Sequence, residues 1–158
     1  MQRTLILLKP DCVERRLAGT VLSRLEQKGF RIVAMKMLSV TETLARQHYA
    51  EHLEKSFFPQ LQAYITSNPV IALVLEGREV VATVRKMVGA TNGIHAEPGT
   101  IRGDFAVSGQ RNLVHASDSE ASAQREIAIF FQPEELVEWK NPHDALYLAA
   151  HERDNLSH

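Results

Sequence analysis

The sequence RTLILL, residues 3–8, decides the fold of this chain. Apolar side chains on both faces of an extended segment indicate a strand in the interior of a sheet. The run VIALVL, residues 70–75, has the same character and predicts a second strand that is covered on both faces. A sheet with such strands needs helices against it, because its apolar faces must be buried by another layer.

Helical and extended patterns alternate around these two strands. Leu17, Val21 and Leu25 recur every four residues among charged side chains, which predicts an amphipathic helix that ends at Gly29. Residues 30–40 are rich in apolar and β-branched side chains and predict a third strand, and a short apolar strand leads into His115. Other segments carry apolar residues at helical spacing and are predicted as helices: residues 42–51, 55–65, 78–88, 120–130 and 133–139.

The order of these elements predicts a fold. Four strands connected through helices give a ferredoxin-like βαββαβ sandwich, an α/β (α+β) fold in which a four-stranded antiparallel sheet is covered by helices. Residues 1–158 are expected to form a single domain, since this length suits one compact core. The last residues, 151–158, are expected to be mobile. The fold hosts many activities and does not decide the function.

The composition excludes several classes of protein. A formal net charge of −1 disfavours a nucleic-acid-binding protein, which would carry a basic excess. One cysteine rules out an intrachain disulfide and fits a reducing compartment. The N-terminal apolar run is too short for a signal peptide, and no segment reaches the length of about 18 apolar residues that a membrane span needs. We therefore expect a cytoplasmic protein without a membrane or nucleic-acid partner.

Residues 89–109 lack a periodic apolar pattern and are expected to form a long loop. A loop of about 20 residues in a compact domain is usually functional. It contains neither a G-x-x-x-x-G-K-[ST] nor a G-x-G-x-x-G motif. A phosphate ligand would therefore be held by side chains and a metal ion rather than by a glycine-rich backbone.

The stretch PGTIRGDFAVSGQRNLVHASDS, residues 98–119, gathers groups suited to phosphoryl transfer. A histidine that attacks phosphorus needs a rigid backbone, cations that draw charge off the phosphate, and partners that fix its tautomer. Arg102, Arg111 and Asn112 supply donors, and residues 117–119 cap the following helix. His115 is thus the candidate nucleophile, against the alternative of a core histidine at the end of a strand.

The run NLVHASDS, residues 112–119, resembles the N-x-x-H-[GA]-S-D-S motif of nucleoside diphosphate kinases. LLKPD, HYAEH, FFPQL, GATNG and PGTIRGDF also follow that family's order and spacing, so the resemblance covers about residues 3–140 and leaves 141–158 as a divergent C-terminal tail. It implies ping-pong transfer of the γ-phosphate of a nucleoside triphosphate to a nucleoside diphosphate, through a phosphohistidine on His115. The family also has the ferredoxin-like fold.

The resemblance assigns residues to the phosphates. By this likeness Lys9, Arg85 and Arg102 spread the charge of the transferring phosphoryl group, which supplies most of the catalysis in such reactions. Thr91 is assigned to phosphate contact, and Tyr49 is expected close to the phosphate site. Mg²⁺ is the expected cofactor, held mainly by the nucleotide phosphates with no protein ligand.

The resemblance also assigns residues to the nucleoside and to the histidine. Phe57 would stack on the base, and Asn112 together with Lys9 would bind ribose hydroxyls and neighbouring oxygens. Ser117 and Glu126 would orient the histidine, because a carboxylate that accepts the proton of one ring nitrogen leaves the other as nucleophile. The expected partners are nucleoside di- and triphosphates and further copies of the chain, as a dimer, tetramer or hexamer.

Some positions depart from the family pattern. Gly109 replaces a valine that in many members contacts the other face of the base, so we expect lower nucleotide affinity with unchanged tolerance for the base. Cys12 replaces a small residue and has no evident activating partner.

His48 and His52 lie four residues apart, but Tyr49 replaces the glutamate of an H-E-x-x-H zinc motif, which disfavours a metal there.

Two other functions compete with the kinase. A catalytically silent, ferredoxin-like nucleotide-binding regulatory module would most simply lack the histidine, the lysine or the arginines, and all of these are present. A nucleic-acid-binding domain would show an aromatic-rich strand and a basic charge balance, which this sequence lacks.

Overall fold

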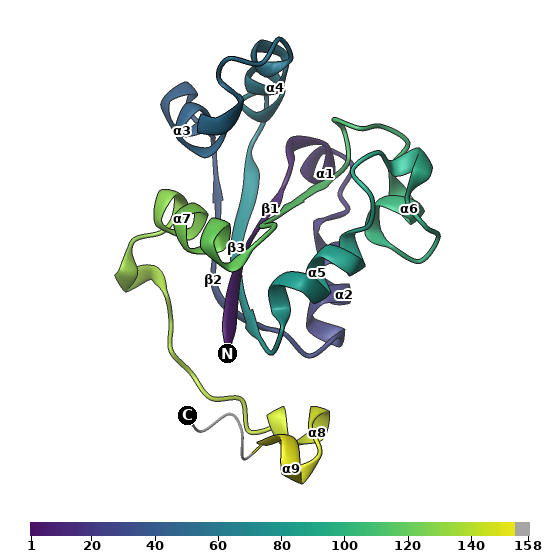
Figure 1. Ribbon diagram of the computed structural model, residues 1–158, viewed down its shortest axis with the longest axis vertical. Helices are drawn as coiled ribbons and strands as arrows, with labels where there is room; N and C mark the ends of the chain where they lie inside the picture. The colour runs from purple at the N-terminus through teal and green to yellow at the C-terminus, as the bar shows by residue number, and fades with distance from the viewer. Residues whose placement is uncertain (154–158) are drawn as a thin grey trace.

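The computed structural model describes residues 1–153. Within this range, four strands form one antiparallel sheet in the order β2-β3-β1-β4 (Figure 1). The strands are β1 (Gln2–Leu8), β2 (Arg31–Leu38), β3 (Val70–Gly77) and β4 (Val114–Ala116). The position of β1 and β3 in the middle confirms the two interior strands, and the strand order confirms the ferredoxin-like α+β fold.

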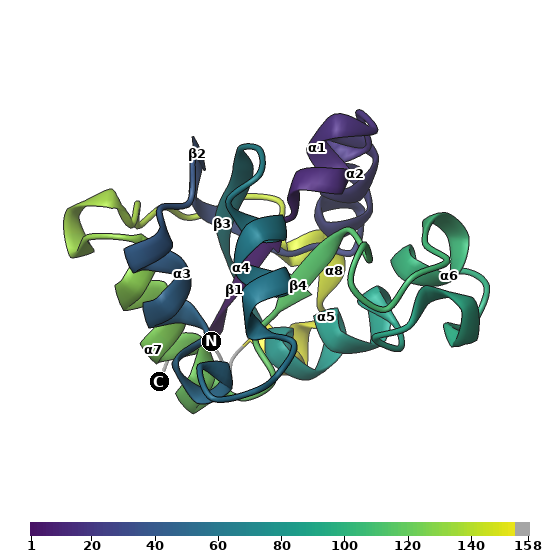
Figure 2. The same cartoon turned by 90° about the horizontal axis from the view of Figure 1, so that it is seen from above.

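Helices pack against both faces of this sheet. Figure 2 shows α3 and α7 on one side of the strands and α1 and α2 on the other. The helices are α1 (Pro10–Glu14), α2 (Ala18–Gln27), α3 (Glu42–His48), α4 (Phe58–Ile65), α5 (Val80–Val88), α6 (Ile101–Phe105), α7 (Glu120–Phe130), α8 (Asp144–Tyr147) and α9 (Ala150–Arg153). Short 3-10 turns at Ala50–His52, Gly93–His95 and Pro133–Glu135 connect some of them.

Alternate residues of β1 supply two separate cores, as the two-residue period of a strand requires. Ile6 and Leu8 face α2 and α5, in a cluster with side chains such as Val21 and Val84. Leu5 and Leu7 face the opposite side, in a cluster with Ile127 and Phe130 of α7. Each fully buried side chain of this size contributes roughly 1.5–3 kcal/mol, so β1 holds both helical layers to the sheet.

The pairing of β1 with β4 sets the position of the candidate nucleophile. Leu7 lies opposite His115 in this antiparallel register. The residues that flank these two strands are bonded as well, because the backbone N–H of Lys9, just after β1, donates to the carbonyl of Leu113, just before β4, at 2.8 Å. The sheet therefore brings residues 9 and 115, far apart in the sequence, to the same end of the molecule.

The segment after β1 departs from the prediction. The sequence predicts no helix between the strand 3–8 and the helix around Leu17–Leu25, but α1 begins at Pro10 with Lys9 as its N-cap. Proline is favoured at the first helical position, because the N–H that it lacks would have no partner within the helix. The helix is too short for a periodic apolar pattern to reveal it.

The region 89–109 is not a structureless loop. It contains α6 and a 3-10 turn, and the hydroxyl of Thr100 caps α6 by accepting the N–H of Gly103. The side chain of Asn92 caps the 3-10 turn in the same way, through the N–H of Ile94. Helices this short show too few apolar residues to form a pattern, so the sequence did not predict them.

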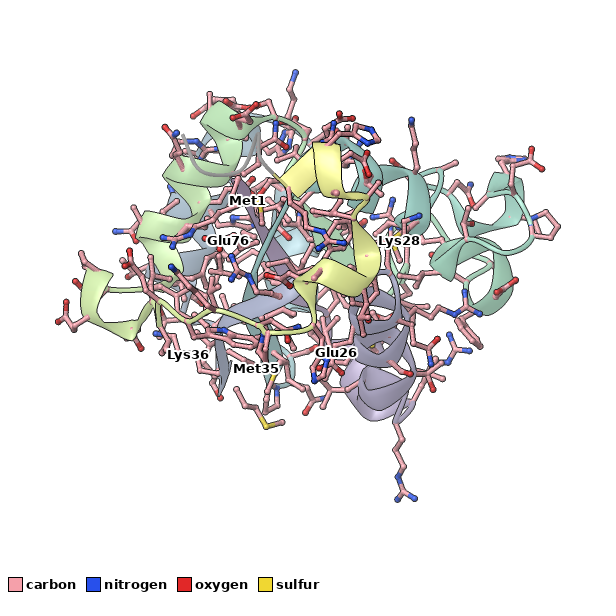
Figure 3. All side chains as sticks on the ribbon, turned by 90° about the horizontal axis from the view of Figure 1, so that it is seen from below. Met1, Glu26, Lys28, Met35, Lys36 and Glu76 are labelled. Atoms are coloured by element: carbon pink, nitrogen blue, oxygen red, sulfur yellow. The ribbon has the colours of Figure 1, made fainter. Side chains whose placement is uncertain are left out.

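The chain beyond α7 also differs from the expected helix 133–139. Helical structure ends at Glu135, and the chain then runs beside the edge strand β2, where the N–H of Val137 donates to the carbonyl of Val33 at 2.8 Å. The indole N–H of Trp139 donates to Ile32 at 3.0 Å. Figure 3 shows α8 and α9 at the lower end of the sheet, near Met1 and Lys28.

The predicted mobility of the C-terminal end concerns residues that are only partly described. His151 belongs to α9, and residues 154–158 lie outside the described residues. Among residues 1–153, no helix has the length and apolar character needed to cross a bilayer.

Candidate active site

The predicted site residues gather around a cavity of about 370 Å³. They come from several elements: the ends of β1 and β4, α5, α6 and the segments around α4. Its walls include Lys9, Tyr49, Phe57, Arg85, Thr91, Arg102, Asn112 and His115. The other two predicted residues, Ser117 and Glu126, lie behind His115 and contact it or each other.

The contacts of His115 distinguish its two ring nitrogens. Nε2 lies 3.0 Å from Oε2 of Glu126 on α7, and the hydroxyl of Ser117 donates to the same carboxylate oxygen at 2.5 Å. Burial alone would raise the pKa of Glu126, but its hydrogen bonds with His115 and Ser117 lower that pKa below its ordinary value. An ionised carboxylate accepts, so Nε2 carries the proton and Nδ1 keeps a free lone pair.

Lys9 is buried at the end of β1, where its ammonium donates to Oδ1 of Asn112 at 2.7 Å. Burial and the neighbouring Arg102 lower the pKa of Lys9 to about 8, although the charge of Asp11 acts in the opposite direction. The amide of Asn112 is itself fixed, since Nδ2 donates to the carbonyls of Thr91 and Gly109 at 2.8 and 2.9 Å. This lysine is therefore held in place through an amide that bridges two loop segments.

Two arginines, Arg85 and Arg102, add positive charge to the wall of the cavity. Arg102 is buried and donates to the carbonyls of Gly89, Asn112 and Val114 at 3.1, 3.2 and 2.6 Å. Burial and the charge of Arg85 lower the pKa of Arg102 to about 10. Within residues 1–153, no carboxylate lies at ion-pair distance from Lys9, Arg85 or Arg102. Such a cluster of cations favours an anionic ligand in the cavity.

The mouth of the cavity has a more open, aromatic side. Phe57 is the N-cap residue of α4 and its side chain is 48% exposed. Its ring centroid lies 5.5 Å from that of His52. Gly109 lines the same cavity and leaves room there, because a Cβ atom placed on it would lie 4.0 Å from its nearest neighbours, atoms of Asn92.

The structure adds residues that the sequence did not assign to the site. His52, Leu61 and Gln110 also line the cavity. The sequence suggested His52 only as a metal ligand. Gln110 follows Gly109 directly, but nothing in its residue type announced a position in the cavity wall.

His48 is the most consequential residue that was missed. Its ring is 5% exposed and packs edge-on against His115, with the centroids 4.7 Å apart, rather than pairing with His52. Burial lowers the pKa of His48 to about 3, so its imidazole is neutral. One ligand atom from each of His48, His115 and Glu126 lies within 4.8 Å of the others, a group that could hold a metal ion.

Known proteins resemble this chain in sequence. The family model described as nucleoside diphosphate kinase matches residues 2–136. A nucleoside diphosphate kinase of Rhodopirellula baltica is 63% identical over 139 residues, which cover 88% of this chain and 91% of that protein. One of Archaeoglobus fulgidus is 56% identical over 140 residues, which cover 89% of this chain and 93% of that protein.

Solved structures agree with the sequence relatives. A halophilic nucleoside diphosphate kinase from Halobacterium salinarum in complex with CDP superposes with a TM-score of 0.92 and 45% identity, over 94% of this chain and 99% of that one. A nucleoside diphosphate kinase family protein from Babesia bovis gives a TM-score of 0.91 and 42% identity, over 94% and 100%. These relatives favour the enzyme over the silent regulatory module. The chain belongs to the nucleoside diphosphate kinase family, a family of phosphotransferases.

Proposed function

We propose that this chain transfers the γ-phosphate of a nucleoside triphosphate to a nucleoside diphosphate through a phosphohistidine on His115. Nδ1 attacks the γ-phosphorus, the bond to the bridging oxygen breaks, and the nucleoside diphosphate leaves with that electron pair. A second nucleoside diphosphate then attacks the phosphohistidine and restores the free imidazole. The observation that supports this route most is the bond between Nε2 and Glu126, which leaves Nδ1 available in a cationic cavity.

Charge changes during the transfer match the groups around the cavity. Phosphorylation of Nδ1 makes the imidazole of His115 cationic, and the Glu126 carboxylate beside Nε2 stabilises that cation. Lys9, Arg85 and Arg102 would face the oxygens of the transferring group, where preorganised cations act most strongly. Tyr49 and Thr91 line the same cavity and are proposed to contact phosphate.

The nucleoside is proposed to lie toward the mouth of the cavity. Phe57 offers an exposed ring there for stacking on the base, an interaction worth roughly 1–3 kcal/mol that tolerates any base. Asn112 and Lys9 lie deeper and would meet ribose hydroxyls and neighbouring oxygens. The relative from Halobacterium salinarum was solved with CDP, which supports a nucleotide as the ligand of this cavity.

Mg²⁺ is proposed to accompany the nucleotide rather than to bind a protein cage. Mg²⁺ prefers oxygen ligands in an octahedral arrangement. The described residues that line the cavity include no carboxylate, so phosphate oxygens and water would supply its ligands. When bound, the ion would neutralise charge on the phosphates, while the cationic side chains hold the remaining oxygens.

Self-association is also proposed. Met35 and Met37 project from the same face of the edge strand β2 and are 54% and 59% exposed. Two exposed apolar side chains on one face of an edge strand offer a surface for a second copy of the chain. A dimer, tetramer or hexamer would each be compatible with this surface. A cytoplasmic location and a single domain over residues 1–158 remain predictions.

Labelling with γ-labelled ATP tests the proposed route. The wild-type protein should acquire phosphate that is labile to acid and stable to base, and His115→Ala should acquire none. His143→Ala, which removes an exposed histidine of the C-terminal segment, serves as the matched control and should label normally. Label that persists in His115→Ala, or a wild-type protein that takes up no label, would contradict the route.

A further inference from the structure

The backbone two residues before His115 adopts an uncommon conformation. Leu113 has a φ of 72° although it is not glycine, and its side chain is fully buried. The N–H of Val114 donates to the carbonyl of Asn112 at 2.8 Å, which makes Leu113 the central residue of a γ-turn with positive φ. Such turns are strained for residues other than glycine and persist only where the surroundings hold them.

The side chain of Asp11 is hydrogen-bonded to this turn. Its Oδ2 accepts the backbone N–H of Leu113 at 3.2 Å. Its Oδ1 accepts the phenolic hydroxyl of Tyr64, which comes from α4. Asp11 is 3% exposed, and each oxygen of this buried carboxylate accepts one hydrogen bond. Three elements, α1, α4 and the turn before β4, meet at this residue.

The turn determines where two proposed site residues lie. Asn112 precedes Leu113 and carries the amide that fixes the ammonium of Lys9 at 2.7 Å. His115 follows it by two residues on a strand only three residues long. Arg102 clamps the turn from the cavity side, through the carbonyls of Asn112 and Val114. A relaxed turn would therefore move the amide and the nucleophile together.

The charge of Asp11 also acts on Lys9. Burial and Arg102 lower the pKa of Lys9, and Asp11 counters them. The ring of Tyr64 lies 5.9 Å from the ammonium, and burial lowers the pKa of the nearby His48 so that its imidazole adds no charge. Among the groups that face this lysine, Asp11 therefore supplies the negative charge that favours its protonated form.

We propose that Asp11 is a positioning residue of the phosphoryl-transfer site. Anchored by Tyr64, its carboxylate holds the turn at Leu113, and its charge keeps Lys9 protonated. This role rests on the proposed function, in which His115 becomes phosphorylated. It differs from a purely structural role in the first turn of α1, because that role would leave the pH dependence of catalysis unchanged.

Asp11→Asn tests both parts of the role. The rate of phosphoenzyme formation from ATP is measured by rapid quenching across the range from about pH 6 to pH 10. We expect the rate at neutral pH to fall at least about tenfold, and the decline on the alkaline side to begin at a lower pH than in wild type. Asp144→Asn removes the same charge from the distant C-terminal segment and is the matched control.

Tyr64→Phe separates position from charge. It removes the hydroxyl that anchors Asp11 but keeps the carboxylate, so the rate should fall about threefold or more while the alkaline decline stays where it is in wild type. This variant also decides the matter if Asp11→Asn does not fold. A folded Tyr64→Phe protein with the wild-type rate would overturn the proposal.

The remaining outcomes distinguish this inference from the proposed function. If Asp11→Asn and Asp144→Asn give the same rate and the same alkaline decline, Asp11 has no positioning role, while labelling of His115 would still stand. A slower Asp11→Asn protein with an unshifted alkaline decline would also overturn the proposal, since a structural defect alone produces that result. If wild type forms no phosphohistidine, the proposed function itself fails.

Discussion

At the scale of single residues, the bond between His115 and Glu126 decides which nitrogen can react. Nε2 and the Glu126 oxygen lie 3.0 Å apart, and the hydroxyl of Ser117 donates to the same oxygen. Glu126→Gln keeps the shape but removes the charge that stabilises the cationic imidazole. We predict that phosphoenzyme formation slows by roughly 10²-fold or more. Single-turnover kinetics would measure this, with the exposed Glu120→Gln on the same helix as control.

An unchanged single-turnover rate in Glu126→Gln would show that this carboxylate does not act on the histidine. The same measurement in Ser117→Ala indicates how much of the effect passes through the orientation of the carboxylate. We expect a smaller loss there, because the charge beside Nε2 remains.

His48 gives a second prediction at this scale, on stability. Its pKa is about 3 in the folded chain, against roughly 6.5 for a solvated histidine. Between these values the unfolded chain binds a proton that the folded chain does not, so stability is lost as the pH falls from about 6.5 toward 3. His48→Phe should reduce the slope of unfolding free energy against pH by up to about 1.4 kcal/mol per pH unit in that window.

Urea unfolding at a series of pH values measures that slope. Phenylalanine suits the site because the ring already packs against Tyr49 and Phe130. Equal slopes for wild type and variant would mean that His48 is protonated in the folded chain as readily as in the unfolded chain.

At the scale of elements, the loop before β4 faces the start of α4 across the cavity mouth. Gly109 leaves space there, and its backbone does not have the positive φ that would favour glycine over valine. A valine there would reach toward a base stacked on Phe57. We predict that Gly109→Val tightens nucleotide binding roughly three- to tenfold, by burying apolar surface, without changing the preference among bases.

Calorimetry with ADP and GDP on a variant that cannot turn over would measure both affinities. A double change with His115→Ala prevents phosphorylation during the titration. Weaker or equal binding in the Gly109→Val protein would show that the open wall does not limit affinity.

The elements also show how much of the structure the sequence could predict. Continuous apolar runs were sufficient to predict β1 and β3. Helical spacing of apolar residues was sufficient to predict α2 and α5, because burial alone determines such patterns. The short helices α1 and α6 were not predicted, since five residues cannot display a period. His115 and its cations were found through a motif.

His48 and Asp11 escaped prediction for a different reason. Their contacts join residues far apart in the sequence, such as Asp11 with Leu113 and His48 with His115. The positive φ of Leu113 cannot be predicted from the sequence, because leucine rarely adopts such a backbone conformation. These features depend on how α1, α3 and β4 meet, which no local pattern encodes.

At the scale of the whole molecule, the part of the edge strand β2 that carries the exposed Met35 and Met37 is the clearest surface for assembly. Met37→Lys places a charge on it, and charged side chains on strand edges oppose pairing with another chain. We predict a lower molar mass in sedimentation equilibrium than for wild type. Leu146→Lys, on the exposed face of α8, is the control and should leave the mass unchanged. The same mass for Met37→Lys and wild type would exclude this edge from the interface.

The proposed mechanism depends on a phosphoryl group carried by one particular atom. The most direct measurement is the structure of the phosphorylated protein, or the ³¹P and ¹⁵N spectra of its histidine, which identify the phosphorylated nitrogen. The mechanism predicts phosphorus on Nδ1 of His115, with Nε2 still hydrogen-bonded to Glu126. Phosphorus on Nε2, or on any other residue, would contradict it.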